Sequence, residues 1–390
     1  MKKYNYKFTK KKKCKDEKNQ KLLNKKVKRD NNKIHKKIKN KIIKFKSCKQ
    51  YKSKNKLKSF NPDKIQLLDS ITNDSFVNVL IDNTFITFKS IEDILYLIYT
   101  NSILSIISYN LNTKQKICEI KNKVGEYISS FRHYLDKNNN MDIIMSIFCS
   151  DNSIRLRNVK NLECILYISN INNRGCLYSA CFLNDDDNNN YIVTCNLVLL
   201  NIPEPIKIYD FNGNKIKEIN ESNDNTFFID FFYDNLISKK FIITGNKGSV
   251  KSYDYNNNKL YIKYSDYNNE EPHCYIIIYN NKNIIKLIES CDDGYIRIWN
   301  FHMGLLLNKI NIENQSINGI CLWNKNYLFV GCNDQTIKLI KIKKGKIIKS
   351  LLGHNSIVCT IKKINHYKYG ECLISQGFLI DKINIWYFSN

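Results

Sequence analysis

Short runs of apolar and β-branched residues recur along most of the chain and are separated by polar turns. The clearest run is YIRIWNF, Tyr295–Phe301, which follows the turn Asp292-Asp293-Gly294. An Asp-Gly pair supplies the positive-φ backbone that a tight β-hairpin requires. Both faces of the run are largely apolar, which is typical of a small sheet covered on both sides. The pattern therefore predicts short antiparallel strands packed between neighbouring sheets.

The same pattern repeats in seven units, with an aromatic residue near the end of one strand in five of them and Arg157 or Ile340 at that position in the other two. We call this residue the anchor, and Trp299 is its clearest example. Steps between successive anchors run from 41 to 52 residues, so each unit has room for about four short strands. The seven anchors are Tyr109, Arg157, Tyr209, Tyr253, Trp299, Ile340 and Trp386.

The last unit opens on Gly353-His354, and its anchor strand is INIWYF, Ile383–Phe388. These residues resemble the WD40-repeat family, whose repeats of about 40–45 residues carry Gly-His near the start and Trp-Asp near the end. The resemblance covers residues 62–390; it is clear in the last three units and degenerate in the first four. It implies an all-β fold, a seven-bladed propeller of four-stranded antiparallel blades.

The resemblance also implies a hydrogen-bonded structural tetrad of His, Ser or Thr, Asp and Trp within a repeat. Only the last unit offers all four residue types. The other blades are expected to hold together by apolar packing alone, with irregular blades among the first four. The tetrad candidates are His354, Ser375, Asp381 and Trp386.

Closure of the ring requires a strand from elsewhere, because the last unit supplies only three. The apolar run KIQLLDSI, Lys64–Ile71, lies ahead of the first unit and is expected to be the fourth strand of the last blade. Such closure removes exposed sheet edges. Residues 94–107 are apolar but interrupted by polar residues, and are shorter than the roughly 20 residues that a bilayer span needs, so they predict two strands. Trp323 precedes a predicted turn and is expected to be partly exposed.

The longest unit contains LNDDDNNNY, residues 183–191, which indicates an insertion. A surface loop whose sequence has changed without functional consequence is the favoured interpretation, since loops tolerate insertions. A protruding docking handle is the alternative. Asp185–Asp187 could bind a hard cation, although a solvated loop is preferred.

Charge divides the chain into two parts. Residues 1–58 hold 25 Lys and one Arg against three acidic residues, so most of the formal net charge of +26 lies in this arm. Such a segment has too few apolar residues to fold alone, and we expect it to be largely disordered. Residues 23–45 carry a narrow apolar stripe between lysines, which predicts a conditional basic amphipathic helix.

The arm predicts an anionic partner. The cluster Lys10, Lys11, Lys12 and Lys13 could contact nucleic acid without sequence specificity or serve as a nuclear-import signal. An inert solvated tail is the first alternative. Binding to a membrane surface or in a helix-binding groove is the second.

Few residues in the sequence indicate a catalytic, metal-binding or cofactor-binding site. The 14 Cys form no CxxC pair and are expected to be reduced core residues of an intracellular protein. The six His are scattered, with no pair at metal-ligand spacing, and no phosphate-binding glycine motif occurs. No metal, no cofactor and no catalytic residue is therefore expected, and the N-terminus lacks the apolar stretch of a signal peptide.

These observations favour a non-enzymatic scaffold that binds other proteins through the faces of a propeller. A nuclear or nucleolar complex for RNA processing or ribosome assembly is the leading setting, because of the arm. A cytoplasmic adaptor in a ubiquitin-ligase or trafficking complex, with an inert tail, is the first alternative. An enzyme built on a propeller is the second, since fold does not fix function.

Overall fold

The chain divides into two units, Met1–Ser59 and Phe60–Asn390. The computed structural model describes residues 60–71, 85–101, 105–123, 125–169, 171, 175–184, 189–198, 205–220, 225–266, 271, 273–281, 284–313, 315–378 and 382–388. All of these residues belong to the second unit. Lys10–Lys13, the expected basic helix and Asp185–Asp187 lie outside the described residues.

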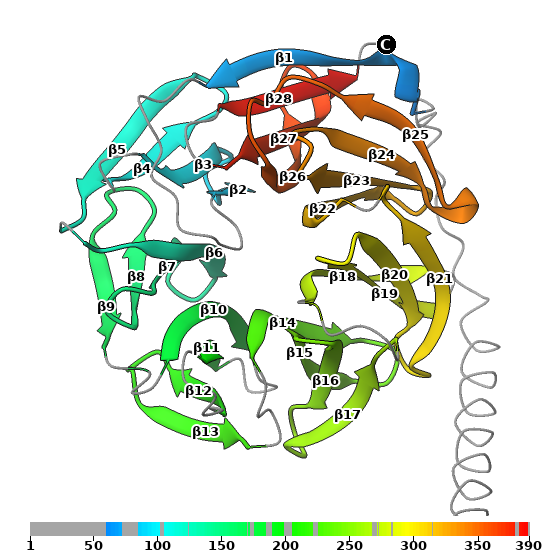
Figure 1. Cartoon of the computed structure of the whole chain (residues 1–390). Helices are drawn as coiled ribbons and strands as arrows, with labels where there is room; N and C mark the ends of the chain where they lie inside the picture. Colours follow the sequence, from blue (N-terminus) through cyan, green and yellow to red (C-terminus); the bar gives the residue numbers. More distant parts are fainter. Residues whose placement is uncertain are drawn as a thin grey trace, which may run out of the picture. The chain divides into compact units, whose positions relative to one another are not determined.

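The second unit is a ring of seven four-stranded antiparallel sheets, as predicted (Figure 1). We number these blades 1 to 7. Blades 1 to 3 are β2–β5 (Phe85–Lys89, Leu95–Thr100, Ser105–Asn110, Gln115–Lys121), β6–β9 (Ile128–Asp136, Met141–Phe148, Ser153–Asn158, Cys164–Ile168) and β10–β13 (Gly175–Asn184, Asn190–Val198, Ile206–Asp210, Lys215–Ile219). Blades 4 to 6 are β14–β17 (Thr226–Asp234, Lys239–Asn246, Ser249–Asp254, Lys259–Tyr264), β18–β21 (His273–Asn281, Ile284–Cys291, Tyr295–Asn300, Leu305–Asn311) and β22–β25 (Ile317–Asn324, Tyr327–Cys332, Ile337–Lys341, Lys346–Leu351). Blade 7 combines β26–β28 (Val358–His366, Gly370–Gly377, Ile383–Phe388) with β1 (Ile65–Ile71).

The hydrophobic core lies between blades. Seven clusters of buried apolar residues occur, and each joins two neighbouring blades. Between blades 5 and 6, for example, Ile298 packs with Val330 in one such cluster. The first strand of each blade lies innermost, around the centre of the ring (Figure 1). This arrangement explains why both faces of each strand are apolar in the sequence.

Closure by the N-terminal strand is confirmed. Strand β1 pairs antiparallel with β28, from Ile65 opposite Phe388 to Ile71 opposite Ile383. The strand begins one residue later than Lys64, because Pro62–Lys64 forms a short 3-10 helix capped by Asn61. The two strands expected within residues 94–107 are also confirmed, as β3 and β4.

All seven anchors occupy one structural position. Each is the fourth or fifth residue of its blade's third strand, and in every blade the outer strand bulges opposite it. The bulge leaves one outer-strand residue unpaired and increases the local twist. The first four blades have the same four strands as the last three, so the expectation of irregular early blades is wrong in this respect.

Trp323 is buried, and the prediction of partial exposure is wrong. Only 4% of the residue is exposed. Its ring lies 4.3 Å from that of Phe388 on β28 and 5.6 Å from that of Phe60, measured between centroids. Both partners are far from Trp323 in the sequence, and they cover the end of β22 where a turn would otherwise leave the ring in solvent.

Candidate functional site

The connections between strands divide into two faces of the ring. In an antiparallel blade, the turns that join the first strand to the second and the third to the fourth lie at one end; we call this the lower face. The turns between second and third strands, and the connections from one blade to the next, lie at the other end and form the upper face. His354 and the turn Asp292–Gly294 belong to the upper face.

Three of the four tetrad candidates come together in blade 7. His354 Nε2 lies 2.7 Å from Ser375 Oγ, and Trp386 Nε1–H donates to the same oxygen at 2.8 Å. Asp381, the fourth candidate, lies outside the described residues. Gly353 has φ +145°, and a Cβ there would lie 3.1 Å from Trp386 Cη2, so a glycine allows the upper connection to approach the anchor ring.

Blade 5 holds its anchor with a carboxylate that the sequence reading missed. Trp299 Nε1–H donates to Glu289 Oε1 at 3.0 Å, and Glu289 is fully buried on β19. Glu289 lies two residues after Leu287, which pairs with Trp299 across the sheet. Ser375 has the same position in blade 7, two residues after Leu373, which pairs with Trp386. The same position holds Ser146, Thr194 and Thr244 in blades 2, 3 and 4, all fully buried.

Buried basic residues connect the third strands to the upper face. Arg297 on β20 is 0% exposed, and its guanidinium donates to Asp293, four residues earlier in the turn of the same blade. Its Nε–H also donates to Asp266 Oδ2 at 3.2 Å, in the connection that leads into blade 5. One side chain therefore ties together two upper connections.

The arrangement recurs in blades 2 and 6. Arg155 contacts Asp151 and Glu126, and Lys338 contacts Asp334 and Glu313. We call these three sets the basic clamps. A repeated signal in the sequence marks them, since a Lys or Arg stands two residues before the anchor in five units: Arg155, Lys207, Lys251, Arg297 and Lys338.

In blade 5 the basic clamp lowers the pKa of both of its carboxylates. Burial raises the pKa of Asp293, but its hydrogen bonds with Arg297 and the positive charge of that group outweigh burial, so the net pKa is lowered. The pKa of Asp266 is lowered mainly by hydrogen bonding to Lys309, with a further contribution from Arg297. A carboxylate whose folded-state pKa is depressed stabilises the fold above its unfolded pKa, and this stabilisation is lost as the pH falls.

We expect Arg297→Met to lower the free energy of unfolding by about 2 kcal/mol at pH 7. This is below the 3–5 kcal/mol typical of a fully buried pair, because both carboxylates keep some solvent exposure. The difference between variant and native protein should shrink as the pH falls below about 4, through the lowered pKa values of Asp266 and Asp293 in the native protein. Urea unfolding at several pH values measures this. The control is Lys89→Met, which breaks an exposed pair with Asp93 and should cost under about 1 kcal/mol. A pH-independent loss in Arg297→Met would contradict the electrostatic role.

The centre of the ring contains a cavity of about 330 Å³ between the first strands of several blades. Phe88, His133 and Lys362 contribute to its lining. His133 is held by Asp142, at 2.7 Å from Nε2 to Oδ1, and its ring stacks on Phe88 at 3.6 Å between centroids. Within the described ranges, no group of three or more His, Cys, Asp or Glu side chains could hold a metal ion.

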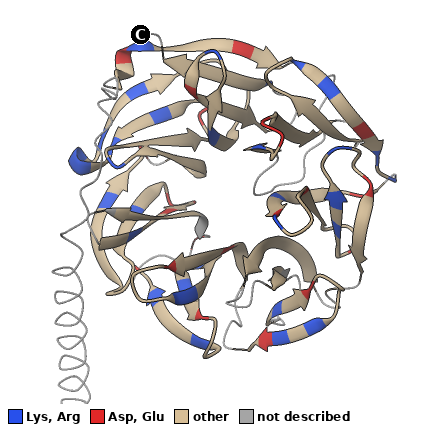
Figure 2. Ribbon diagram, turned by 180° about the vertical axis from the view of Figure 1, so that it is seen from behind, with Lys and Arg blue, Asp and Glu red and all other residues tan. Residues whose placement is uncertain are grey.

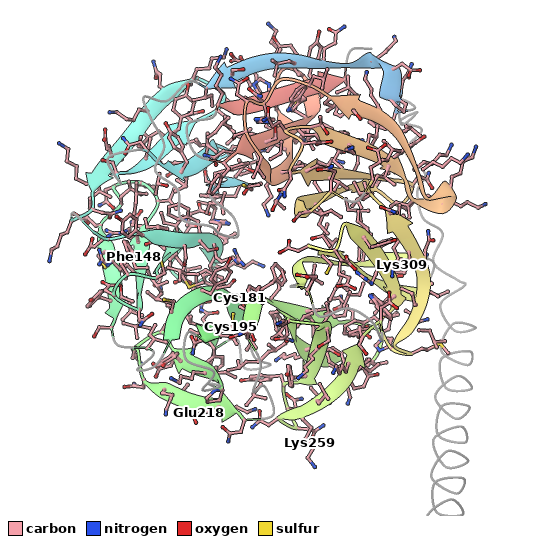
Figure 3. All side chains as sticks on the ribbon, in the orientation of Figure 1. Phe148, Cys181, Cys195, Glu218, Lys259 and Lys309 are labelled. Carbon is pink, nitrogen blue, oxygen red and sulfur yellow. The ribbon has the colours of Figure 1, made fainter. Side chains whose placement is uncertain are left out.

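The cysteines of the described chain are free, and most are buried. Figure 3 shows Cys181 and Cys195 inside the ring of sheets, whereas Glu218 and Lys259 lie at its outer rim. Burial raises the pKa of Cys321 to about 11 and that of Cys372 to about 12, so these thiols are packing residues rather than nucleophiles. No helix in the described part of the chain is long and apolar enough to cross a membrane.

The fold and the upper face define a seven-bladed β-propeller protein. No protein-family model matches the sequence, and no curated protein matches it. Among solved structures, the chain is similar to the crystal structure of Chaetomium thermophilum Raptor, with 14% sequence identity and a TM-score of 0.61. The match covers 84% of this chain and 29% of that chain. At this identity the similarity shows the fold alone.

Proposed function

We propose that the chain is a WD40-type propeller that acts as a non-enzymatic scaffold, with protein partners docking on the upper face. The observation that supports this is the set of basic clamps. Each clamp fixes two upper connections to a third strand through ion pairs, so the face is rigid before a partner arrives. A preorganised surface binds with a smaller loss of conformational entropy.

Charge indicates the kind of partner. Both signs of charge occur around the ring as a whole (Figure 2). In the described connections of the upper face, acidic residues outnumber basic ones. The acidic residues are Glu126, Asp151, Asp266, Glu271, Asp292, Asp293, Glu313 and Asp334, and the basic ones are Lys123, Lys247 and Lys382. Six of these acidic residues are already paired with Arg155, Arg297 or Lys338 in the basic clamps. A partner with a basic docking segment would therefore meet Glu271 and Asp292, the acidic residues outside the clamps, and complementary charge there would raise association rates and specificity.

Affinity purification tests the proposal. The bait would be residues 60–390, compared with the variant Glu271→Lys/Asp292→Lys on the upper face. Both positions are exposed, so the fold should persist. The matched control is Lys343→Glu/Lys344→Glu, two exposed lysines on the lower face. The upper variant should lose partners that the native protein and the lower variant retain. Loss with the lower variant alone would contradict the assignment.

For the arm, we propose contact with RNA or another polyanion in a nuclear or nucleolar complex. The support is its charge density, since lysines near phosphates release counterions. Affinity of the full chain for single-stranded RNA should fall at least tenfold between about 50 and 200 mM salt. Deleting residues 1–59 should abolish this binding. Equal binding with and without the arm would favour the adaptor with an inert tail.

A further inference from the structure

A second cavity, of about 260 Å³, lies at the seam where blade 7 meets blade 1. Strand β1 and Ile385 of β28 form one side, and the turn Leu111–Lys114 of blade 1 forms the other. The turn of residues 367–369 closes the lower end. A more open groove continues from it along the seam and shares Asp69, Tyr109 and Lys114 with it. The cavity is separate from the upper face.

Lys114 has a left-handed backbone conformation at this cavity. Its φ is +57°, in the left-handed region. The equivalent residues are Gly304 and Gly345 in blades 5 and 6, with φ +63° and +59°, and Leu162 and Asn258 in blades 2 and 4, with φ +59° and +55°. Glycine adopts this conformation without the strain that a lysine side chain brings. The left-handed conformation is therefore shared by this turn in several blades, and what distinguishes Lys114 is its charge: it forms an ion pair with Asp69 beside the cavity.

His366 is a second polar residue at the cavity. The residue is only 6% exposed and lines the cavity. Its Nδ1 accepts the backbone N–H of Lys368 at 3.2 Å, so the ring proton sits on Nε2. No described residue forms a hydrogen bond with Nε2. Burial, then the charges of Lys114 and Lys368, lower the pKa of His366, as expected where positive charge is in excess.

The remaining lining is apolar and aromatic. Its members are Leu68, Leu111, Ile385, Tyr109, Tyr367 and Tyr369. The volume is just below the roughly 300 Å³ at which ligand pockets begin. It therefore suits one planar ring with a small substituent. Three residues with side-chain donors contribute to the lining, namely Lys114, His366 and Lys368. The nearby carboxylate of Asp69 is bonded to Lys114 and to the Ser70 N–H.

We propose that this cavity binds a small planar molecule carrying a phosphate monoester. The phosphate would lie among Lys114, His366 and Lys368, because a phosphate offers several acceptor oxygens to convergent donors. The ring would pack between the tyrosines and the apolar residues. This site adds a small-molecule ligand to the scaffold and does not depend on the identity of any protein partner.

Calorimetric titration of the full chain with phenyl phosphate, inorganic phosphate and benzyl alcohol tests this. Phenyl phosphate should bind at least about tenfold more tightly than inorganic phosphate, a difference of about 1.4 kcal/mol, and benzyl alcohol should not bind. Phenyl phosphate should also shift the NMR signals of the His366 ring. No binding, or equal binding of phenyl and inorganic phosphate, would overturn the proposal and leave at most an adventitious anion site.

The variants separate binding from folding. Lys114→Gly removes the cation and places a glycine where the backbone is left-handed, so the melting temperature should not fall while affinity drops at least about tenfold. Lys368→Ala, at an exposed position, should also weaken binding. Lys344→Ala, in the corresponding turn of blade 6, is the matched control and should bind as the native protein does. Native affinity in Lys114→Gly would overturn the proposal.

Discussion

Deleting residues 64–71 should abolish cooperative folding of the propeller. Strand β1 is the fourth strand of blade 7, and its removal would expose the edge of β28 along six paired positions. It would also remove Ile65 from the cluster between blades 6 and 7 and uncover the apolar residues that pack there. Unpaired strand edges promote aggregation, and the loss of a ring-closing strand is comparable with the total stability of about 5–15 kcal/mol that domains possess. Thermal melts and size-exclusion chromatography measure the outcome.

Deletion of residues 1–59 is the control. This truncation keeps Phe60, which packs on Trp323 and Phe388, and keeps the whole of β1. Its melting temperature should stay close to that of the full chain. Similar behaviour of the two deletions would contradict the role of β1 in closing the ring.

Replacing the anchor Trp386 with Ala should lower the free energy of unfolding by about 3–5 kcal/mol, as large buried rings do. The side chain lies between blades 6 and 7 with 3% exposure. Its loss would also deprive Ser375 of a donor, and buried polar groups without partners cost about 1–3 kcal/mol. Trp386→Phe keeps most of the packing and removes the N–H, so it should cost less. Chemical denaturation measures both.

Trp299→Ala and Trp323→Ala should fall in the same range of about 3–5 kcal/mol. Trp299 donates to the buried carboxylate of Glu289, and Trp323 contacts aromatic rings from blade 7. An outer-strand control is Leu305→Ala, since Leu305 is 53% exposed and should cost under about 1 kcal/mol. A cost for Trp323→Ala no larger than that control would contradict the packing described above.

The fold was predictable because its determinants are local and repeated. Apart from β1 in blade 7, the strands of each blade lie within one sequence unit, so turn residues and the anchor position identify the seven units. The same holds for the closing strand, since Lys64–Ile71 is an apolar run with no other sheet to join. His354, Ser375 and Trp386 also lie within one unit, which is why the contact between their side chains could be predicted from the sequence.

Contacts between units were not predictable in this way. The burial of Trp323 depends on Phe60 and Phe388. The pairing of Arg297 with Asp266 joins residues of neighbouring units. The basic residue that recurs two positions before the anchor could have indicated such ion pairs. The seam cavity depends on the distance between the first and last blades, which no local pattern specifies.

Hydrogen exchange of residues 60–390, with and without a partner recovered by affinity purification, tests the scaffold function most directly. Partner binding should slow exchange in upper connections, such as residues 292–294, 333–336 and 352–357, and leave the lower turns unchanged. Protection confined to lower turns such as residues 111–114 and 342–345 would contradict the proposed docking face.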